Sequence, residues 1–458
     1  MRLADLVARL RGDGAIRQLA GPSLISVVVK ILSAGLTYLM FVALARVMTV
    51  AEYGRFSFTF NLATFLCFVA GFGLHNAILR WLPEYQARNQ PDAQRAVFAW
   101  SLGMTLLGSL LTWTAAVAGL VALDAVGLAP PDASKAALLL LAPLAFAELI
   151  SASLRTRDAL IWSLAPKDVA WRVIVLGWCA ALLATGRAVS AGAAILVMGV
   201  ALSGLVAVQL VAYFRRSGGL SAHRGGAAAS DAAGWRRTAT PIWLAGILIS
   251  LIQYMDVVLV GLMRGPVETA HYFVAARTAS LMGLLLVGSN MVCAPIISRL
   301  IHSDRYDELR RVLMLNAIGI AVPTLAVLLV FVVFGRFVLA IFGAEFAGDY
   351  DLLVVLSIGY ALNALGGPMS YVLQIAGQER AYLRIMTITY AGTFVFQLVT
   401  IAAFGAIGAA IGSAAGLLVL NLWSRRVAIG RVGVDPTILS TRRPLGAWLR
   451  SRTRDARG

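Results

Sequence analysis

The sequence is poor in charge and in cysteine for its length. Only 13% of its 458 residues are charged and 60% are apolar, whereas soluble domains carry about 25% charged and about 45–50% apolar residues. The three cysteines, Cys67, Cys179 and Cys293, all lie inside apolar runs, which excludes a secreted scaffold built on disulfides. This composition also excludes an ordinary soluble enzyme and a disordered chain, and it predicts a polytopic membrane protein.

Groups that catalyse reactions or bind metals are equally scarce. The four histidines are scattered, so no zinc-ligand spacing occurs. The sequence also lacks a phosphate-binding glycine loop and the Ser, His and Asp order of a hydrolase. We therefore predict no catalytic residues, no metal site and no cofactor. If such a membrane protein is a transporter, its energy would come from a gradient of H+ or Na+ as the coupling ion, or from consumption of the product outside, because the sequence has no nucleotide-binding loop.

Long apolar runs take up more than half of the chain. A spanning helix needs about 20 apolar residues, and runs of this length recur along the whole sequence. We predict twelve spans, near residues 22–44, 56–79, 97–121, 136–154, 169–185, 190–213, 241–262, 271–294, 312–334, 352–376, 382–403 and 405–423.

The net charge of +17 is distributed unevenly between the predicted flanks. If the N-terminus is inside, the cytoplasmic flanks hold 31 Lys and Arg residues and the outer flanks hold 6, with Arg172 and Arg384 at the inner ends of their spans counted among the 31. This asymmetry follows the positive-inside rule, so both termini are predicted to be cytoplasmic. The basic excess therefore indicates topology and attraction to anionic membrane lipids, and it does not indicate binding of nucleic acid.

Composition and the predicted spans divide the chain into five segments. The predicted fold is all-α, with about twelve transmembrane helices in two six-helix lobes. The segments are a basic amphipathic N-terminal segment (1–21), a first lobe (22–213), a cytoplasmic linker rich in Gly and Ala (214–240), a second lobe (241–424) and a basic cytoplasmic tail (425–458).

A short motif recurs at the same place in both predicted lobes. Residues 48–56 follow the first span and residues 263–272 follow the seventh. Each has Met, a short turn, a Glu (Glu52 or Glu268) and an aromatic residue four positions later. An even number of spans per lobe makes the two lobes parallel repeats, a transporter design with a cleft between its halves.

Four runs resemble elements of a known family. Residues 44–54 (LARVMTVAEYG) resemble the element after the first helix of Wzx-type bacterial polysaccharide flippases. Residues 342–346 (FGAEF), 376–380 (AGQER) and 405–410 (GAIGAA) are similar to that family's elements before helix ten, between helices ten and eleven, and at the start of helix twelve. The departure is at residues 48–51, where Met-Thr-Val-Ala replaces the usual Leu-Gly-Pro-Glu.

This resemblance covers about residues 20 to 425 and implies a function. The family belongs to the multidrug/oligosaccharidyl-lipid/polysaccharide exporter superfamily, whose members have a MATE-like fold of two lobes around a central cavity. The implied activity is a flippase that moves an undecaprenyl-pyrophosphate-linked oligosaccharide from the inner to the outer leaflet, for a capsule, an O-antigen of lipopolysaccharide or an exopolysaccharide. The implied location is the bacterial inner membrane, with membrane lipids and other polysaccharide assembly proteins as partners.

Four charged residues lie deep inside predicted spans: Lys30, Glu148, Asp256 and Arg277. A charge at the bilayer centre costs at least about 2.5–3.5 kcal/mol, so each marks a candidate site. In the functional interpretation the two cations bind the pyrophosphate, and the two acids couple transport to an ion. In the structural interpretation, salt bridges between Lys30 and Glu148 and between Asp256 and Arg277 hold helices together. Flippases of this type often carry Asp and Arg at the positions of the second pair, which favours function.

Neutral polar residues and aromatic rings inside spans are candidate sugar contacts. Glycans are bound by hydrogen bonds and aromatic faces, whereas the alternative role of such residues is hydrogen bonding between helices. The candidates are Asn61, Gln253, Tyr254, Asn290, Asn363 and Gln374.

Two glycine motifs are interpreted as structural. Gly408, Gly412 and Gly416 repeat every four residues and mark one face of the twelfth span for close helix contact. The Glu52-Tyr53-Gly54 element is interpreted as a turn in which Gly54 allows unusual backbone angles.

Two other functions stay open. A multidrug or cation antiporter of the same superfamily should have an acidic cavity, whereas this chain places two cations beside two acids inside its spans. A glycan polymerase or ligase of the membrane would carry a large outer loop with functional Arg and His, and the longest outer loops predicted here are short.

Overall fold

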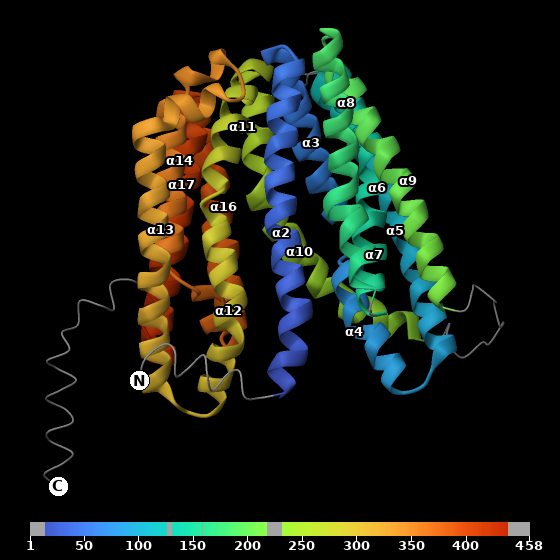
Figure 1. Ribbon diagram of the computed structural model, residues 1–458, viewed down its shortest axis with the longest axis vertical. Coiled ribbons are helices and arrows are strands. Elements are labelled where there is room, and N and C mark those ends of the chain that lie inside the picture. The colour runs from blue at the N-terminus through green and yellow to red at the C-terminus, as the bar shows by residue number, and fades with distance from the viewer. Residues whose placement is uncertain (1–13, 126–130, 158, 218–230, 438–458) are drawn as a thin grey trace, which may run out of the picture. The chain divides into compact units, whose positions relative to one another are not determined.

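The computed structural model describes residues 14–125, 131–157, 159–217 and 231–437. Throughout these residues the regular structure is helical (Figure 1), which confirms the predicted all-α fold. The segments predicted at 1–21, 214–240 and 425–458 lie partly outside the described residues.

Most of the described helices are long and apolar enough to cross a membrane. Nine pass this test, and the number reaches eleven if each of two bent pairs counts as one span. One pair is α3 (Val50–Ala70) with α4 (Leu74–Ala87), which meet at 41°, and the other is formed by the two halves of α10 (Ala232–Arg264), at 52°. The predicted span at 136–154 lies within a further helix, α6 (Pro131–Arg155). The chain is therefore a multi-pass membrane protein.

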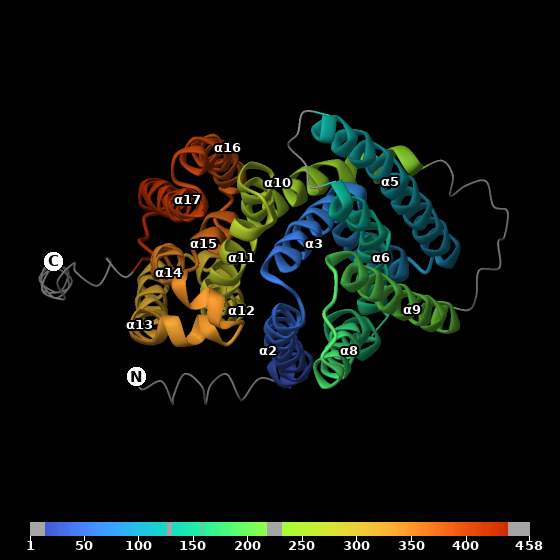
Figure 2. The same ribbon diagram turned by 90° about the horizontal axis from the view of Figure 1, so that it is seen from above.

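The chain divides into two compact units, residues 1–270 and 271–458. In the first unit α6 contacts α3, α5 and α9, and α2 packs on α8 and a π-helix, η1 (Figure 2). The helices of this unit not yet given are α2 (Gly14–Val47), α5 (Pro91–Ala125), α7 (Leu160–Leu164), η1 (Ala165–Ala170), α8 (Trp171–Thr185) and α9 (Ala191–Ser217).

The division into units does not coincide with the predicted linker. It falls inside α11 (Pro266–Ser280) because α10 packs against α3 and α4 and so belongs to the first unit. Residues 218–230 of the linker lie outside the described residues, and its residues 232–240 form the start of α10. The predicted six-helix lobes therefore stay a prediction.

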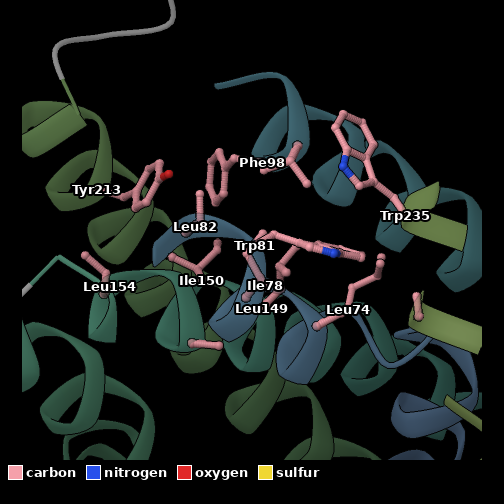
Figure 3. Packing of buried hydrophobic residues seen from close by; sticks show 14 of the residues in the cluster. Leu74, Ile78, Trp81, Leu82, Phe98, Leu149, Ile150, Leu154, Tyr213 and Trp235 are labelled. Atoms are coloured by element: carbon pink, nitrogen blue, oxygen red, sulfur yellow. The ribbon is translucent and has the colours of Figure 1, made fainter. Parts of the chain in front are cut away.

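An aromatic cluster packs α4 against α5, α6, α9 and the first turns of α10 (Figure 3). Trp81 and Trp235 belong to it and Trp100 packs against it, with the rings of Trp100 and Trp235 5.3 Å apart. The Trp235 indole also donates a hydrogen bond to the hydroxyl of Tyr85, at 2.9 Å. A buried indole N–H needs such a partner, so this cluster fixes the end of the bent second span without leaving a polar group unpaired.

The second unit contains the remaining helices. They are α12 (Gly283–His302), α13 (Tyr306–Ala340), a 3₁₀ turn η3 (Ala344–Gly348), α14 (Tyr350–Leu365), α15 (Met369–Ile375), α16 (Glu379–Phe404), α17 (Ala406–Val427) and a π-turn η4 (Ala428–Val432). Helices α16 and α17 lie side by side (Figure 2). A Cβ added at Gly408 would lie 1.9 Å from the Thr400 carbonyl oxygen of α16, and Gly412 and Gly416 also face α16. The predicted packing face of the twelfth span is confirmed.

Glycine is required at position 54, after the first helix, for a different reason from the predicted one. Gly54 lies inside α3 and has no positive φ, so it is not needed for unusual backbone angles. A Cβ at Gly54 would instead lie 1.7 Å from the carbonyl oxygen of Pro266, at the start of α11. The side chain of Glu52 accepts a hydrogen bond from the backbone N–H of Ala191, at 2.7 Å. The motif therefore joins α3 to the starts of α11 and α9.

Candidate functional site

The fifth span begins earlier than predicted. Its helical stretch starts at Leu160 rather than at residue 169 and passes through α7, η1 and α8. Lys167 and Asp168 were therefore predicted to lie in a flank, and the structure places them inside the span. An apolar run at residues 160–164 before Pro166 is the sequence feature that could have indicated this.

Pro166 opens the backbone of this span. Proline has no N–H, so the carbonyl of Trp162, four residues earlier, loses its helical donor. The side-chain amide of Gln209 on α9 donates to that carbonyl at 2.9 Å and to the carbonyl of Ser163 at 3.0 Å. The hydroxyl of Ser151 on α6 also donates to the Ser163 carbonyl, at 2.8 Å. Neighbouring helices thus satisfy the opened π-turn, which a membrane interior requires.

This arrangement gives a stability prediction. Replacing Gln209 with Leu should leave the partly buried carbonyl of Trp162 unpaired and lower the free energy of unfolding by about 1–3 kcal/mol. Pro166→Ala restores an N–H that can donate to the Trp162 carbonyl, so the double variant should lose less than the sum of the two single variants. Thermal unfolding of the four proteins in one detergent measures this coupling, and strictly additive losses would contradict the assignment of Gln209 to the break.

The π-turn directs two charged side chains to different helices. The ammonium of Lys167 lies 2.6 Å from a carboxylate oxygen of Glu148 on α6, and the carboxylate of Asp168 lies 3.4 Å from the ammonium of Lys30 on α2. The predicted direct pair of Lys30 with Glu148 is therefore wrong, because each residue has a partner on η1. A π-helix accommodates one more residue in its turn than an α-helix, and it often occurs at functional sites.

Arg172, one turn further along α8, adds a third cation. Its guanidinium donates to the backbone carbonyls of Asp168, at 2.6 Å, and of Lys167, at 3.1 Å, and it stacks over the ring of Trp171. Tyr254 of α10 lies within electrostatic range of this guanidinium. We call Lys30, Glu148, Lys167, Asp168 and Arg172 the N-terminal charge cluster.

The N-terminal charge cluster has three cations and two acids. The two ion pairs differ in strength: Glu148 and Lys167 are at contact distance with side chains 25% and 19% exposed, whereas Lys30 is 50% exposed and its contact is longer. An exposed pair contributes little, so an incoming anion can replace Asp168 at Lys30 more readily than it can displace Glu148 from Lys167. The cluster can therefore bind an anion at Lys30 while Glu148 keeps its partner.

Glu148 lines a narrow pocket in the first unit. The other lining residues come from α3, the α3–α4 turn, α4, α5 and α6, among them Cys67, His75 and Thr105. The rings of His75 and Phe68 pack edge to face, 5.8 Å apart. Sequence reasoning missed His75 because it treated the four histidines only as metal ligands. Among the described residues, no group of three or more His, Cys, Asp or Glu is placed to hold a metal ion.

The second predicted pair divides between the two units. Asp256 lies in the first unit, where its carboxylate accepts from the N–H of Val257 at 2.8 Å. Arg277 lies in the second unit, with its guanidinium over the ring of Phe273 at 4.9 Å. Their pairing and their roles stay predictions.

The candidate sugar contacts have different surroundings. Asn61 is fully buried and donates to the carbonyl of Ser57 in its own helix, at 2.7 Å. Asn363 accepts from the side chain of Asn421, at 3.0 Å, and so joins α14 to α17. Asn290 and Tyr254 are half-buried, and Gln253 and Gln374 are exposed. Of these residues, Gln253 and Gln374 present the most side chain to a ligand.

Comparison with known protein families shows to which family the chain belongs. A family model described as polysaccharide biosynthesis protein matches residues 22–301. The chain belongs to this family. A second family model, MatE, matches residues 241–399, and no curated protein sequence matches the chain.

Solved structures of transporters share the fold. An inward-facing multidrug resistance transporter of the MATE family and MOP superfamily has a TM-score of 0.71 at 15% identity, over 89% of this chain and 99% of that one. The lipid II flippase MurJ, in an inward closed conformation, has a TM-score of 0.69 at 12% identity, over 89% of this chain and 87% of that one. A MOP superfamily transporter from Pyrococcus furiosus has a TM-score of 0.58 at 15% identity, over 89% of this chain and 96% of that one. This member of the polysaccharide biosynthesis family therefore has a MATE-like fold, as predicted.

Proposed function

We propose that the protein is a flippase that moves an undecaprenyl-pyrophosphate-linked oligosaccharide from the inner to the outer leaflet of the bacterial cytoplasmic membrane, for surface polysaccharide biosynthesis. The family match over residues 22–301 is the observation that carries this proposal. A lipid II flippase with the same fold supports it, because that protein also moves a lipid-linked substrate.

The N-terminal charge cluster supports a pyrophosphate as the anionic group. Pyrophosphate needs cations held in a site partly stripped of water, since hydrogen bonds from charged donors to phosphate are then strong. Lys30 is the cation most readily freed, because its contact with Asp168 is 3.4 Å long and its side chain is half exposed. We propose that the phosphate replaces Asp168 at Lys30. Arg277 of the second unit is proposed as a phosphate-binding cation in its own right. Gln253, Tyr254 and Gln374 would then contact sugars.

Glu148 is the proposed coupling group. It is partly buried beside Lys167, and it lines a narrow pocket together with His75. A carboxylate in such a place can take up a proton or bind Na+ once its cationic partner moves. Asp256 is the corresponding candidate carboxylate on α10. Coupling to an ion gradient is thus proposed to depend on Glu148 and Asp256.

Multidrug export is the second candidate function. The MatE match over residues 241–399 and the multidrug transporter among the structural relatives favour it. The excess of one cation in the N-terminal charge cluster opposes it, because a cationic drug would be repelled there.

A deletion strain tests the proposal and separates the two candidates. We expect loss of surface polymer and retention of complete lipid-linked repeat units on the inner leaflet. Complementation with Lys30→Gln or Arg277→Gln should reduce export about tenfold or more, because each loses a charge-assisted hydrogen bond of about 1.5–3 kcal/mol. Arg187→Gln, which removes one charge from an exposed position, should complement fully. Unchanged polymer together with a broad fall in drug tolerance would contradict the proposal and favour the antiporter.

A further inference from the structure

A pocket opens beside the last turns of α17 in the second unit. Its volume is about 610 Å³. Its walls come from α17 and from η4, where the backbone widens into a π-turn and Gly430 adds no side chain. The lining residues are Val419, Leu422, Trp423, Arg426, Val427, Gly430 and Arg431.

The wall along the body of α17 is apolar and exposed. Val419 and Leu422 are 47% and 48% exposed, and they lie within a helix that is long and apolar enough to span the membrane. Trp423 follows them toward the helix end, and tryptophan is enriched where the hydrocarbon core meets the headgroups. The wall therefore changes from hydrocarbon to interface within two helical turns.

The wall at the helix end is cationic. Arg426 and Arg431 are both exposed, and among the ion pairs of the described residues neither has a carboxylate partner. Arg431 donates to the side-chain oxygen of Gln378 at 2.9 Å, a neutral partner that leaves its charge in place. Two positive charges thus border one pocket.

The neighbouring Arg425 shows the contrasting arrangement. Its guanidinium lies 2.6 Å from a carboxylate oxygen of Asp435, which also accepts from the backbone N–H and the hydroxyl of Thr437. Burial alone would raise the pKa of Asp435, but the hydrogen bonds from Arg425 and Thr437 and the charge of Arg425 hold that pKa below its usual value. Asp435 therefore stays ionised at neutral pH and neutralises Arg425, whereas the charges that border the pocket are not neutralised.

We propose that this pocket binds one anionic phospholipid. The phosphate would lie between Arg426 and Arg431, and an acyl chain would lie along Val419 and Leu422. The apolar wall followed by the cationic wall matches the order of acyl chain and headgroup in a lipid. The two arginines match an anionic headgroup. The leaflet at this end is the one that the positive-inside rule predicts to be cytoplasmic. The site shares no residue with the N-terminal charge cluster, so it stands whether or not the proposed function is correct.

Native mass spectrometry of the purified protein with added phosphatidylglycerol or phosphatidylcholine tests the charge requirement. The wild type should retain one phosphatidylglycerol in preference to phosphatidylcholine. A surface Arg contributes about 1 kcal/mol of attraction to anionic lipid, so affinity for phosphatidylglycerol should fall about fivefold in Arg426→Gln or Arg431→Gln and about 25-fold in the double variant. Arg336→Gln removes one exposed charge near the C-terminal end of α13, outside the pocket lining. This control variant should bind phosphatidylglycerol as the wild type does. Equal affinity in the double variant and the wild type would overturn the proposal.

Gly430→Leu separates a pocket from a diffuse basic surface. A Cβ at Gly430 meets nothing within 4 Å, so a leucine side chain starts in open space, occupies part of the pocket and keeps both arginines. Affinity for phosphatidylglycerol should fall at least as far as in the single arginine variants. Binding of phosphatidylglycerol by Gly430→Leu at the wild-type level would show that the charges act without the pocket and would overturn the proposed site.

Discussion

Replacing Glu148 and Lys167 together with glutamine is expected to leave a folded protein that no longer exports polymer. The pair has a 2.6 Å contact between side chains that are 25% and 19% exposed. Removing both charges avoids a buried, uncompensated ion, and such neutral replacements are often tolerated. The proposed coupling carboxylate is lost all the same, so export should fall by about 10²-fold or more, because a positioned proton-transfer group usually contributes about 10²–10⁴-fold.

The single variants should behave differently from the double variant. Lys167→Gln leaves Glu148 without its cation. The loss of free energy of unfolding is about 3–5 kcal/mol for a fully buried pair, and we expect about 1–3 kcal/mol, the cost of leaving a buried polar group unpaired, for these partly exposed side chains. Unfolding temperature in detergent and surface polymer in complemented cells measure the two effects separately. The order of stability should be wild type, then the double variant, then Lys167→Gln.

A second charge pair provides the matched control. Arg264 and Glu268 pair at 3.1 Å with side chains 39% and 37% exposed, one turn apart across the α10–α11 break. Their double glutamine variant should lose less than about 0.5 kcal/mol and should export normally. Normal export by Glu148→Gln/Lys167→Gln would remove Glu148 from the coupling mechanism and leave the pair with a structural role only.

Gly54→Ala is expected to prevent stable folding. The added methyl group would lie 1.7 Å from the backbone carbonyl oxygen of Pro266, and no rotamer change relieves a clash between a Cβ and a backbone atom. Overpacking typically costs about 1–3 kcal/mol where side chains can yield, so a backbone clash should cost more. The amount of monodisperse protein after extraction and its unfolding temperature measure the loss.

Gly103→Ala is the control for this variant. Gly103 lies in the interior of α5, and a Cβ there meets nothing within 4 Å. Alanine favours a helix over glycine by about 0.8–1.0 kcal/mol, so this variant should unfold at or slightly above the wild-type temperature. Wild-type stability in Gly54→Ala would show that α3 and the start of α11 are not in close contact.

The sequence was sufficient for the membrane fold because its main determinant is local. A run of about 20 apolar residues specifies a span by itself, and the repeat Gly408, Gly412 and Gly416 specified the packing face of α17 without tertiary information. Gly54 shows what the sequence alone could not predict. The motif was visible in the sequence, but its cause is contact with Pro266, more than two hundred residues away, and only the structure places the two together.

The candidate site was harder to predict because proline and charge usually mark the end of a span. Pro166, Lys167 and Asp168 were therefore placed in a flank, and the partners of Lys30 and Glu148 were missed. The features that keep these charges inside the span are tertiary: the Gln209 amide supplies the donor that proline lacks, and facing helices supply the counter-charges. A sequence pattern with a helical period contains none of these distances.

Transport by the purified protein tests the central claim most directly. The protein would be reconstituted into liposomes that carry a lipid-linked oligosaccharide, and a membrane-impermeant enzyme or lectin would measure how much of it is reached in each leaflet. The account predicts that the wild type moves the substrate between leaflets, that an ion gradient makes the movement directional, and that the Glu148→Gln/Lys167→Gln protein loses this directional movement. Leaflet exposure equal to that of protein-free liposomes would contradict the account.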